Sequence, residues 1–215
     1  MHSTSEHAIH TILVGQSGGP TAAINASLAG IVRIAHTQGL RVLGMRNGIQ
    51  GFLEGNVVDL IEILELEEPK LGALKQAGTN LGEKNLQLLR KTPSSWLGSC
   101  RFKLPELADN SESTAVSPIY QQIYAQLKKY QVDAVLYIGG NDSMDTTDKL
   151  SRYFAQVESA VRVVGVPKTI DNDLEGTDHT PGFGSAARFV ASVTAELTRD
   201  GGVYNTKNVT FIEAM

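Results

Sequence analysis

The amino-acid sequence predicts an α/β fold with a three-layer, Rossmann-like arrangement, in which helices flank both faces of a mostly parallel sheet. Two observations support this prediction. Short apolar runs alternate along the chain with segments whose apolar residues recur at helical spacing. Several of these runs lead directly into polar loops that contain glycine or aspartate, as the carboxyl ends of parallel strands often do.

The first fifty residues predict a strand, a helix and a second strand. Residues 8–14 form an apolar run, and a glycine-rich corner at residues 15–20 follows it. The next apolar residues recur at spacings of four, three and four, which predicts a helix, and they are Ile24, Leu28, Ile31 and Ala35. Gly39 ends this helix and residues 41–45 return as a strand, so a right-handed βαβ unit is expected.

The middle of the chain is less regular. Seven glycines interrupt residues 47–107, so we expect mostly loops with short helices there. Residues 108–115 are polar and weakly patterned, and they predict an exposed loop. Order returns at Ser117 and Pro118, an N-cap and a first helical residue. The apolar face of this helix is Ile119, Ile123, Leu127 and Tyr130.

The second half continues the alternation. Residues 132–138 are almost entirely β-branched or apolar, which predicts a central strand buried on both faces. A helix is expected around residues 144–154 and another buried strand at residues 161–166. Residues 184–199 predict a last helix, and residues 208–213 predict a last strand.

Composition limits the possible functions. With 19 Lys and Arg against 23 Asp and Glu, the net charge is -4, so no broad surface for nucleic acid is expected. The single cysteine, Cys100, can form no internal disulfide. Residues 1–10 lack the features of a signal peptide and no stretch is apolar enough to span a membrane, so we expect a cytoplasmic, non-membrane protein. The N-terminal histidines predict a solvated tail, and they are His2, His7 and His10.

Two glycine-bearing loops suit a phosphate ligand. Gly18 and Gly19 let backbone N–H groups approach a ligand at the start of a helix, where the partial positive charge favours phosphate. A plain tight turn is the alternative, since the loop is neither a G-x-G-x-x-G fingerprint nor a Walker loop. Asn141 and Asp142 follow a second glycine pair and offer oxygen ligands for Mg²⁺ or a hydrated phosphate. A helix N-cap is the alternative there.

A third loop brings one cation and two carboxylates together. Lys168 stands three residues before Asp171, and Asp173 follows. This composition suits phosphoryl transfer to an alcohol, because the lysine neutralises the phosphate and an aspartate accepts the hydroxyl proton. An Asx-rich turn with a solvated lysine is the alternative. Three such loops at successive strand ends together predict phosphate chemistry.

Five stretches of the sequence resemble, in the same order, those of the phosphofructokinases. They are Ser17-Gly18-Gly19 with Asn25, Gly98-Ser99-Cys100-Arg101, residues 139–143, residues 167–173 and Thr180-Pro181-Gly182-Phe183. The resemblance spans nearly the whole chain and implies the two-domain phosphofructokinase fold. Asp142 and Lys168 each resemble a place where ATP-dependent members usually carry glycine. They therefore imply the pyrophosphate-dependent branch, in which the Asp142 side chain would crowd the α-phosphate of a nucleotide.

The resemblance also implies roles for single residues. Asp171 looks like the general base that takes the proton from the 1-hydroxyl of fructose 6-phosphate, Asp173 like its supporting carboxylate and Lys168 like a contact of the pyrophosphate. Thr169 and Ile170, together with Asp171, resemble the family's short segment that lies along the bound sugar. The residues that resemble the family's donor-phosphate site are Gly18, Gly19, Arg101, Asp142, Ser143 and Lys168.

The metal site and the chain end depart from the family pattern. Asn141 stands where many members place an aspartate that binds Mg²⁺, so Asp142 is expected to share the ligation. Glu213-Ala214-Met215 resembles the start of a Glu-x-Met-Gly-Arg stretch in which the methionine meets the sugar phosphate. The expected organisation is a donor domain at residues 1–178 and the start of a sugar-phosphate domain at residues 179–215, truncated at its C-terminal side.

The resemblance further implies a homo-oligomer, dimer or tetramer, whose sugar sites are completed across subunits. We expect the chain alone to be poorly stable and inactive. Three alternatives remain open. One is an ATP-dependent phosphofructokinase, and another is a non-catalytic phosphate-binding regulatory module. A lipid or nicotinamide-nucleotide kinase with a similar Gly-Gly-Asp corner is the third, although such kinases are not expected to share residues 167–173 and 180–183.

Overall fold

The computed structural model describes residues 8–66, 81–107 and 117–213. The chain divides into two compact units, Met1–Pro167 and Lys168–Met215. The predicted exposed loop at residues 108–115 lies outside the described residues, as do His2, His7 and Met215. Among the residues described, no helix is both long enough and apolar enough to cross a lipid bilayer.

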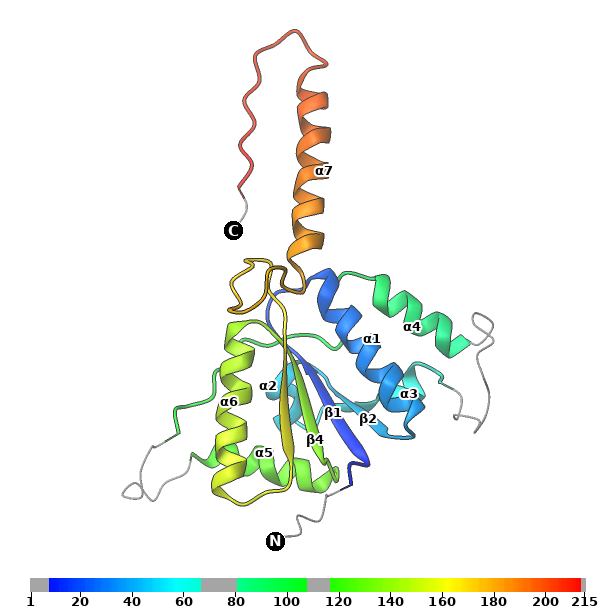
Figure 1. Ribbon diagram of the computed structural model, residues 1–215, viewed down its shortest axis with the longest axis vertical. Helices are drawn as coiled ribbons and strands as arrows, with labels where there is room; N and C mark the ends of the chain where they lie inside the picture. Colours follow the sequence, from blue (N-terminus) through cyan, green and yellow to red (C-terminus); the bar gives the residue numbers. More distant parts are fainter. Residues whose placement is uncertain (1–7, 67–80, 108–116, 214–215) are drawn as a thin grey trace. The chain divides into compact units, whose positions relative to one another are not determined.

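The first unit is built on a five-stranded sheet with the order β3-β2-β1-β4-β5 (Figure 1). β1 pairs in parallel with both β2 and β4, and β4 pairs in parallel with β5, whereas β3 is antiparallel to β2. The sheet is therefore mostly parallel, as the sequence predicts. Its strands are β1 (Thr11–Gln16), β2 (Arg41–Met45), β3 (Val57–Asp59), β4 (Ala134–Gly139) and β5 (Arg162–Pro167).

Helices cover both faces of the sheet, each over its own apolar cluster. Along β1 the side chains alternate, so that Ile12 and Val14 enter one cluster and Leu13 enters the other. The Ile12 cluster is covered by α1 (Ala22–Thr37), α3 (Leu60–Ile63) and α4 (Leu81–Lys91). The Leu13 cluster is covered by α2 (Gly48–Leu53), α5 (Pro118–Lys129) and α6 (Asn141–Gln156). This three-layer arrangement confirms the predicted fold class (Figure 1).

Several local expectations need correction. β3 was not expected, because three residues are too few to show an alternating pattern. Ser117 precedes α5 but its side chain makes no capping hydrogen bond, while Pro118 occupies the first turn as expected. Residues 161–166 were expected to be a buried strand, yet Val164 is 47% exposed and β5 is an edge strand of the described sheet.

The second unit contains a folded loop, α7 (Phe183–Gly201) and an extended tail. No residue of α7 is buried. The predicted strand at residues 208–213 is wrong, since the described part of this segment forms no strand and Phe211 is 93% exposed. A strand needs a neighbour for its backbone hydrogen bonds, and the described residues provide none for this apolar segment.

Candidate active site

The order in which the chain adds strands to the sheet reverses between β1 and β4. From β1 the chain adds β2 and β3 on one side, and it then returns to add β4 and β5 on the other. The Ser17 N–H donates a hydrogen bond to the Ile138 carbonyl oxygen at 2.9 Å, so the loops that leave β1 and β4 lie side by side. Open α/β sheets bind ligands in the crevice outside the carboxyl ends of the strands at such a switch point. Two of the three loops singled out from the sequence meet there.

The loop after β1 is shaped by glycine and tied to the segment that carries Arg101. Gly18 has φ 82°, a left-handed conformation that favours glycine. The Ser99 hydroxyl donates to the Gly18 carbonyl oxygen at 2.9 Å, and the Ser17 hydroxyl donates to the Cys100 carbonyl oxygen at 3.3 Å. These two bonds place the start of the Arg101 segment beside the Gly18 loop, and the Arg101 side chain is exposed there.

The loop after β4 packs tightly against the β1 loop. A Cβ on Gly139 would lie 2.0 Å from Ser143 Oγ and 2.8 Å from the Ser17 carbonyl oxygen, so a side chain at this position would force the loops apart. Ser143 itself is buried. Asp142 lies in the first turn of α6, where the positive end of the helix dipole favours a carboxylate or a phosphate.

The Asp142 carboxylate has a cationic neighbour. Lys103 Nζ lies 3.3 Å from Asp142 Oδ1, and both side chains are about three-quarters exposed. An ion pair this exposed adds little to stability. It does, however, place one positive and one negative group at the start of α6, where a donor phosphate is expected.

A buried polar network fixes the floor of the β1 loop. The Gln16 side chain is fully buried, its amide donates to Asn25 Oδ1 at 3.2 Å, and its carbonyl oxygen accepts from the Leu97 N–H at 2.8 Å. Asn25 also donates to the Thr92 carbonyl oxygen and accepts from the Trp96 N–H, both at 2.9 Å. Asn25, which the family resemblance includes, therefore acts here as a structural link.

The third loop belongs to the second unit and begins with Lys168, directly after the last residue of β5. Its backbone is held by Thr169, whose N–H donates to the Pro181 carbonyl oxygen and whose hydroxyl accepts from the Asp171 N–H, both at 3.0 Å. The Thr180 hydroxyl donates to the Thr169 carbonyl oxygen at 3.0 Å. The loop therefore has a defined conformation in which Lys168 and Thr169 are buried.

The acidic side of this loop faces solvent. Asp171, Asp173 and Ile170 are all exposed. Asn172, between the two aspartates, has φ 54° and accepts from the Thr180 N–H at 3.0 Å, which stabilises the turn. Burial lowers the pKa of Lys168, although the nearby negative charge of Asp171 acts in the opposite direction.

The predicted site residues thus fall into two sets. Gly18, Gly19, Arg101, Asn141, Asp142 and Ser143 belong to the first unit, at the switch point or on segments bonded to it. Lys168, Thr169, Ile170, Asp171 and Asp173 belong to the loop of the second unit. Their chemical roles stay predictions. Lys103 has no role among the sequence-based predictions, although a lysine two positions after Arg101 is visible in the sequence.

The residues present fit a magnesium ion that arrives with phosphate. Among the described residues no three or more His, Cys, Asp or Glu side chains cluster where they could hold a metal ion by themselves. Mg²⁺ at phosphate-transfer sites commonly keeps several waters and uses only one or two protein carboxylates. The oxygens of Asn141 and Asp142, in the first turn of α6, suit that limited contribution.

Fold and site together define a Rossmann-like α/β protein with glycine-bearing loops that meet at the switch point of its sheet. The phosphofructokinase family model matches residues 11–215, and the chain belongs to this family.

The similar proteins include enzymes named for pyrophosphate and enzymes named for ATP. The chain is 36% identical to a pyrophosphate–fructose 6-phosphate 1-phosphotransferase of Xanthomonas campestris pv. campestris, over 95% of this chain and 44% of that protein. It is 33% identical to an ATP-dependent 6-phosphofructokinase of Aliivibrio salmonicida, over 84% of this chain and 45% of that protein. The crystal structure of a pyrophosphate-dependent phosphofructokinase from Marinobacter aquaeolei matches 90% of this chain and 42% of its own, with a TM-score of 0.68 and 33% identity. The chain therefore spans less than half the length of these relatives.

Proposed function

We propose that the protein is a phosphotransferase that moves a phosphoryl group from pyrophosphate to the 1-hydroxyl of fructose 6-phosphate, a step of glycolysis. The observation that supports pyrophosphate most directly is the pair Asp142 and Lys168, which resemble glycine positions of ATP-dependent members. Asp142 is exposed in the first turn of α6. In the proposed donor site its carboxylate would crowd the α-phosphate of a nucleotide. A compact pyrophosphate would avoid this crowding.

The proposed reaction is an in-line displacement without a covalent enzyme intermediate. The 1-hydroxyl oxygen of the sugar forms a bond to one phosphorus of pyrophosphate, the bond from that phosphorus to the bridging oxygen breaks, and inorganic phosphate leaves. Asp171 accepts the hydroxyl proton and Asp173 supports it electrostatically. Lys168 neutralises charge on the transferred group.

Donor binding is assigned to the first unit. Backbone N–H groups at Gly18 and Gly19, the Arg101 guanidinium and the Ser143 hydroxyl would hold phosphate oxygens. Bound Mg²⁺ would neutralise phosphate charge, with Asn141 and Asp142 as its protein ligands. Thr169 and Ile170 would line the sugar, with Met215.

The domain assignment is also part of the proposal. Residues 1–178 would form the donor domain and residues 179–215 the start of the sugar-phosphate domain. A homo-oligomer, dimer or tetramer, and a cytoplasmic location are expected from the resemblance. We further expect the 215-residue chain on its own to be inactive.

An ATP-dependent 6-phosphofructokinase is the second candidate, because relatives of that name match 84% of this chain. The deciding experiment is a coupled assay for fructose 1,6-bisphosphate on the protein encoded by the full reading frame, with Mg-pyrophosphate and Mg-ATP offered separately. Turnover with pyrophosphate alone supports the proposal. Turnover with ATP alone replaces the donor assignment. Sugar-phosphate binding without turnover of either donor supports a regulatory module instead.

A double variant sharpens the donor test. Asp142→Gly with Lys168→Gly removes both groups held responsible for donor choice. If they act as a donor filter, the variant loses turnover with pyrophosphate and gains measurable turnover or binding with ATP. A variant that keeps the wild-type preference for pyrophosphate would show that the choice is made by other residues.

A further inference from the structure

Residues 101–107 form an irregular segment that runs beside α6. Near its start Lys103 Nζ lies 3.3 Å from Asp142 Oδ1, and near its end Glu106 Oε1 lies 2.7 Å from Lys149 Nζ. Asp142 and Lys149 are seven residues apart on the helix, which corresponds to about 10 Å along its axis. Three residues of extended chain, from Lys103 to Glu106, also cover about 10 Å. The segment therefore follows one face of α6 from its first turn toward its middle.

Lys149 is the main polar link between the helix and this segment. It is only 5% exposed, and its ammonium donates to the Leu104 carbonyl oxygen at 3.3 Å, to Asp145 Oδ2 at 2.8 Å and to Glu106 Oε1. These contacts match the three donors of an ammonium group. A buried ammonium is unfavourable unless its donors are satisfied, so the segment and Lys149 hold each other in place. The hydrogen bonds that the ammonium donates to Asp145 and Glu106 raise the pKa of Lys149.

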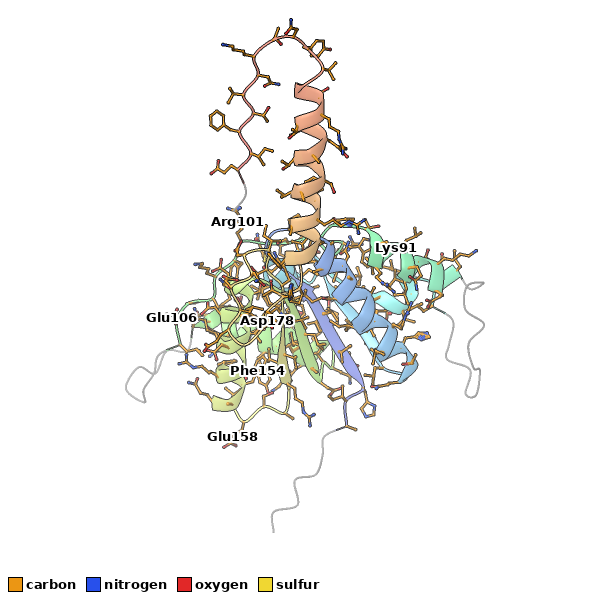
Figure 2. The ribbon with its side chains drawn as sticks, turned by 45° about the horizontal axis from the view of Figure 1, so that its top comes forward. Lys91, Arg101, Glu106, Phe154, Glu158 and Asp178 are labelled. Atoms are coloured by element: carbon orange, nitrogen blue, oxygen red, sulfur yellow. The ribbon has the colours of Figure 1, made fainter. Side chains whose placement is uncertain are left out.

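Further contacts anchor the far half of the segment. The Tyr120 hydroxyl donates to the Pro105 carbonyl oxygen at 2.6 Å, and Leu104 and Leu107 are buried in the α5 and α6 cluster. The near half carries the exposed Arg101 and Lys103 side chains, whereas Glu106 lies further along (Figure 2 labels Arg101 and Glu106). Lys149 contacts the chain at Leu104, the boundary between these two halves.

We propose that Lys149 is a positioning residue for the phosphoryl donor, because by fixing the 101–107 segment against α6 it holds Lys103 next to Asp142 at the helix start and steadies Arg101, which follows the residues bonded to the Gly18 loop. Lys103 is then a further donor contact. Its ammonium offsets the Asp142 charge, which would otherwise repel an anionic donor at about 4 Å or closer. This inference rests on the proposed function, in which the donor binds at the switch point.

The test compares variants in the protein encoded by the full reading frame. Lys149→Met keeps an unbranched apolar stem and removes all three donors. We expect kcat/KM for Mg-pyrophosphate to fall by about 10- to 100-fold through a higher KM, because a misplaced binding group far from the reacting atoms has an effect of that size. The KM for fructose 6-phosphate stays unchanged. Lys149→Arg, which can still donate to the same oxygens, restores most of the donor KM.

The matched control is Arg152→Met, which removes a basic side chain from the same helix. Arg152 is 44% exposed and forms an ion pair at 3.8 Å with Asp148 of its own helix. We expect this variant to keep the wild-type KM for both substrates. An unchanged pyrophosphate KM in Lys149→Met, or an equal effect in Arg152→Met, would overturn the inference.

Hydrogen exchange gives a readout that does not depend on turnover. In Lys149→Met the backbone amides of residues 101–107 exchange faster, while those of β1 and α1 keep their protection. If wild-type protein turns over neither donor, the proposed function fails, and selective exchange at residues 101–107 still decides whether Lys149 fixes the segment. If Lys149→Met does not fold, Glu106→Gln decides instead, with a smaller shift in the same direction supporting the inference and no shift overturning it.

Discussion

Asp171 is the residue on which the proposed proton transfer depends. Its carboxylate is exposed, while its backbone N–H is fixed by Thr169 Oγ1 at 3.0 Å, so the side chain can change without releasing the loop. We expect Asp171→Asn to lower kcat by about 10²- to 10⁴-fold, since a general base contributes that much. Steady-state kinetics and a pyrophosphate titration by calorimetry test this together. Near-normal turnover, or loss of pyrophosphate affinity in step with kcat, would remove Asp171 from the role of base.

The buried Lys168 ammonium is expected to lower the stability of the folded protein while it strengthens donor binding. Burial lowers its pKa below 10.5, so at neutral pH its charged form lowers the stability of the folded state. The unfolded chain binds more protons between the lowered pKa and 10.5, and stability therefore rises with pH across that window. We expect Lys168→Met to raise Tm at neutral pH and to weaken pyrophosphate binding. The gain in Tm should shrink as pH approaches 10.5.

A pair of thermal melts and titrations checks this second prediction. Lys128→Met is a suitable control, because Lys128 lies in α5 of the first unit, where its ammonium stands 4.2 Å from the centre of the Tyr124 ring. It should change neither pyrophosphate affinity nor the dependence of Tm on pH near 10. A lower Tm for Lys168→Met at neutral pH would show that the Lys168 ammonium stabilises the loop.

Gly139 tests the junction between β4 and α6. A Cβ there would lie 2.0 Å from Ser143 Oγ, so Gly139→Ala must displace either the start of α6 or the β1 loop. We expect a loss of about 1 to 3 kcal/mol in unfolding free energy, as overpacking usually causes, and weaker donor binding. Gly30→Ala in α1 is the matched control, because a Cβ added at Gly30 would have nothing within 4 Å. It should raise stability by about 0.5 to 1 kcal/mol.

Chemical denaturation and pyrophosphate titration of both alanine variants measure the two effects. Equal stability changes for Gly139→Ala and Gly30→Ala would mean that the loops yield without strain. Stability loss in Gly139→Ala with unchanged donor affinity would separate the junction from the donor site.

Most elements could be predicted from local pattern, whereas their long-range contacts could not. The apolar runs that became β1, β2, β4 and β5 and the helical spacing of α1 and α5 were visible in the sequence. β3 is too short for a pattern. Residues 208–213 have strand-like composition, but composition supplies no pairing partner.

The same limit applies to the candidate site. Its loops could be found, because glycine and aspartate directly after an apolar run indicate a strand end. The tie between Lys149 and Leu104 joins residues 45 positions apart, and nothing in either local sequence indicates it. Likewise, the direct hydrogen bond from Ser17 to Ile138 depends on which strands are neighbours in the sheet.

At the scale of the whole molecule, the two units differ in how they bury apolar side chains. Both core clusters consist of residues before Lys168. The second unit exposes large apolar side chains, and they include Phe189, Val203, Tyr204, Val209 and Phe211. Exposed apolar patches of this kind promote association.

We therefore expect residues 1–167 to fold without the second unit and to behave better in solution than residues 1–215. The shorter chain keeps both clusters and all five described strands, so it should unfold in one cooperative transition, remain monomeric and bind less of a hydrophobic dye. Residues 1–215 should bind more dye and self-associate at lower concentration. Thermal melts, dye fluorescence and size-exclusion chromatography compare the two chains directly. If residues 1–167 fail to fold while residues 1–215 melt cooperatively as a monomer, the second unit must contribute packing that its exposed side chains do not suggest.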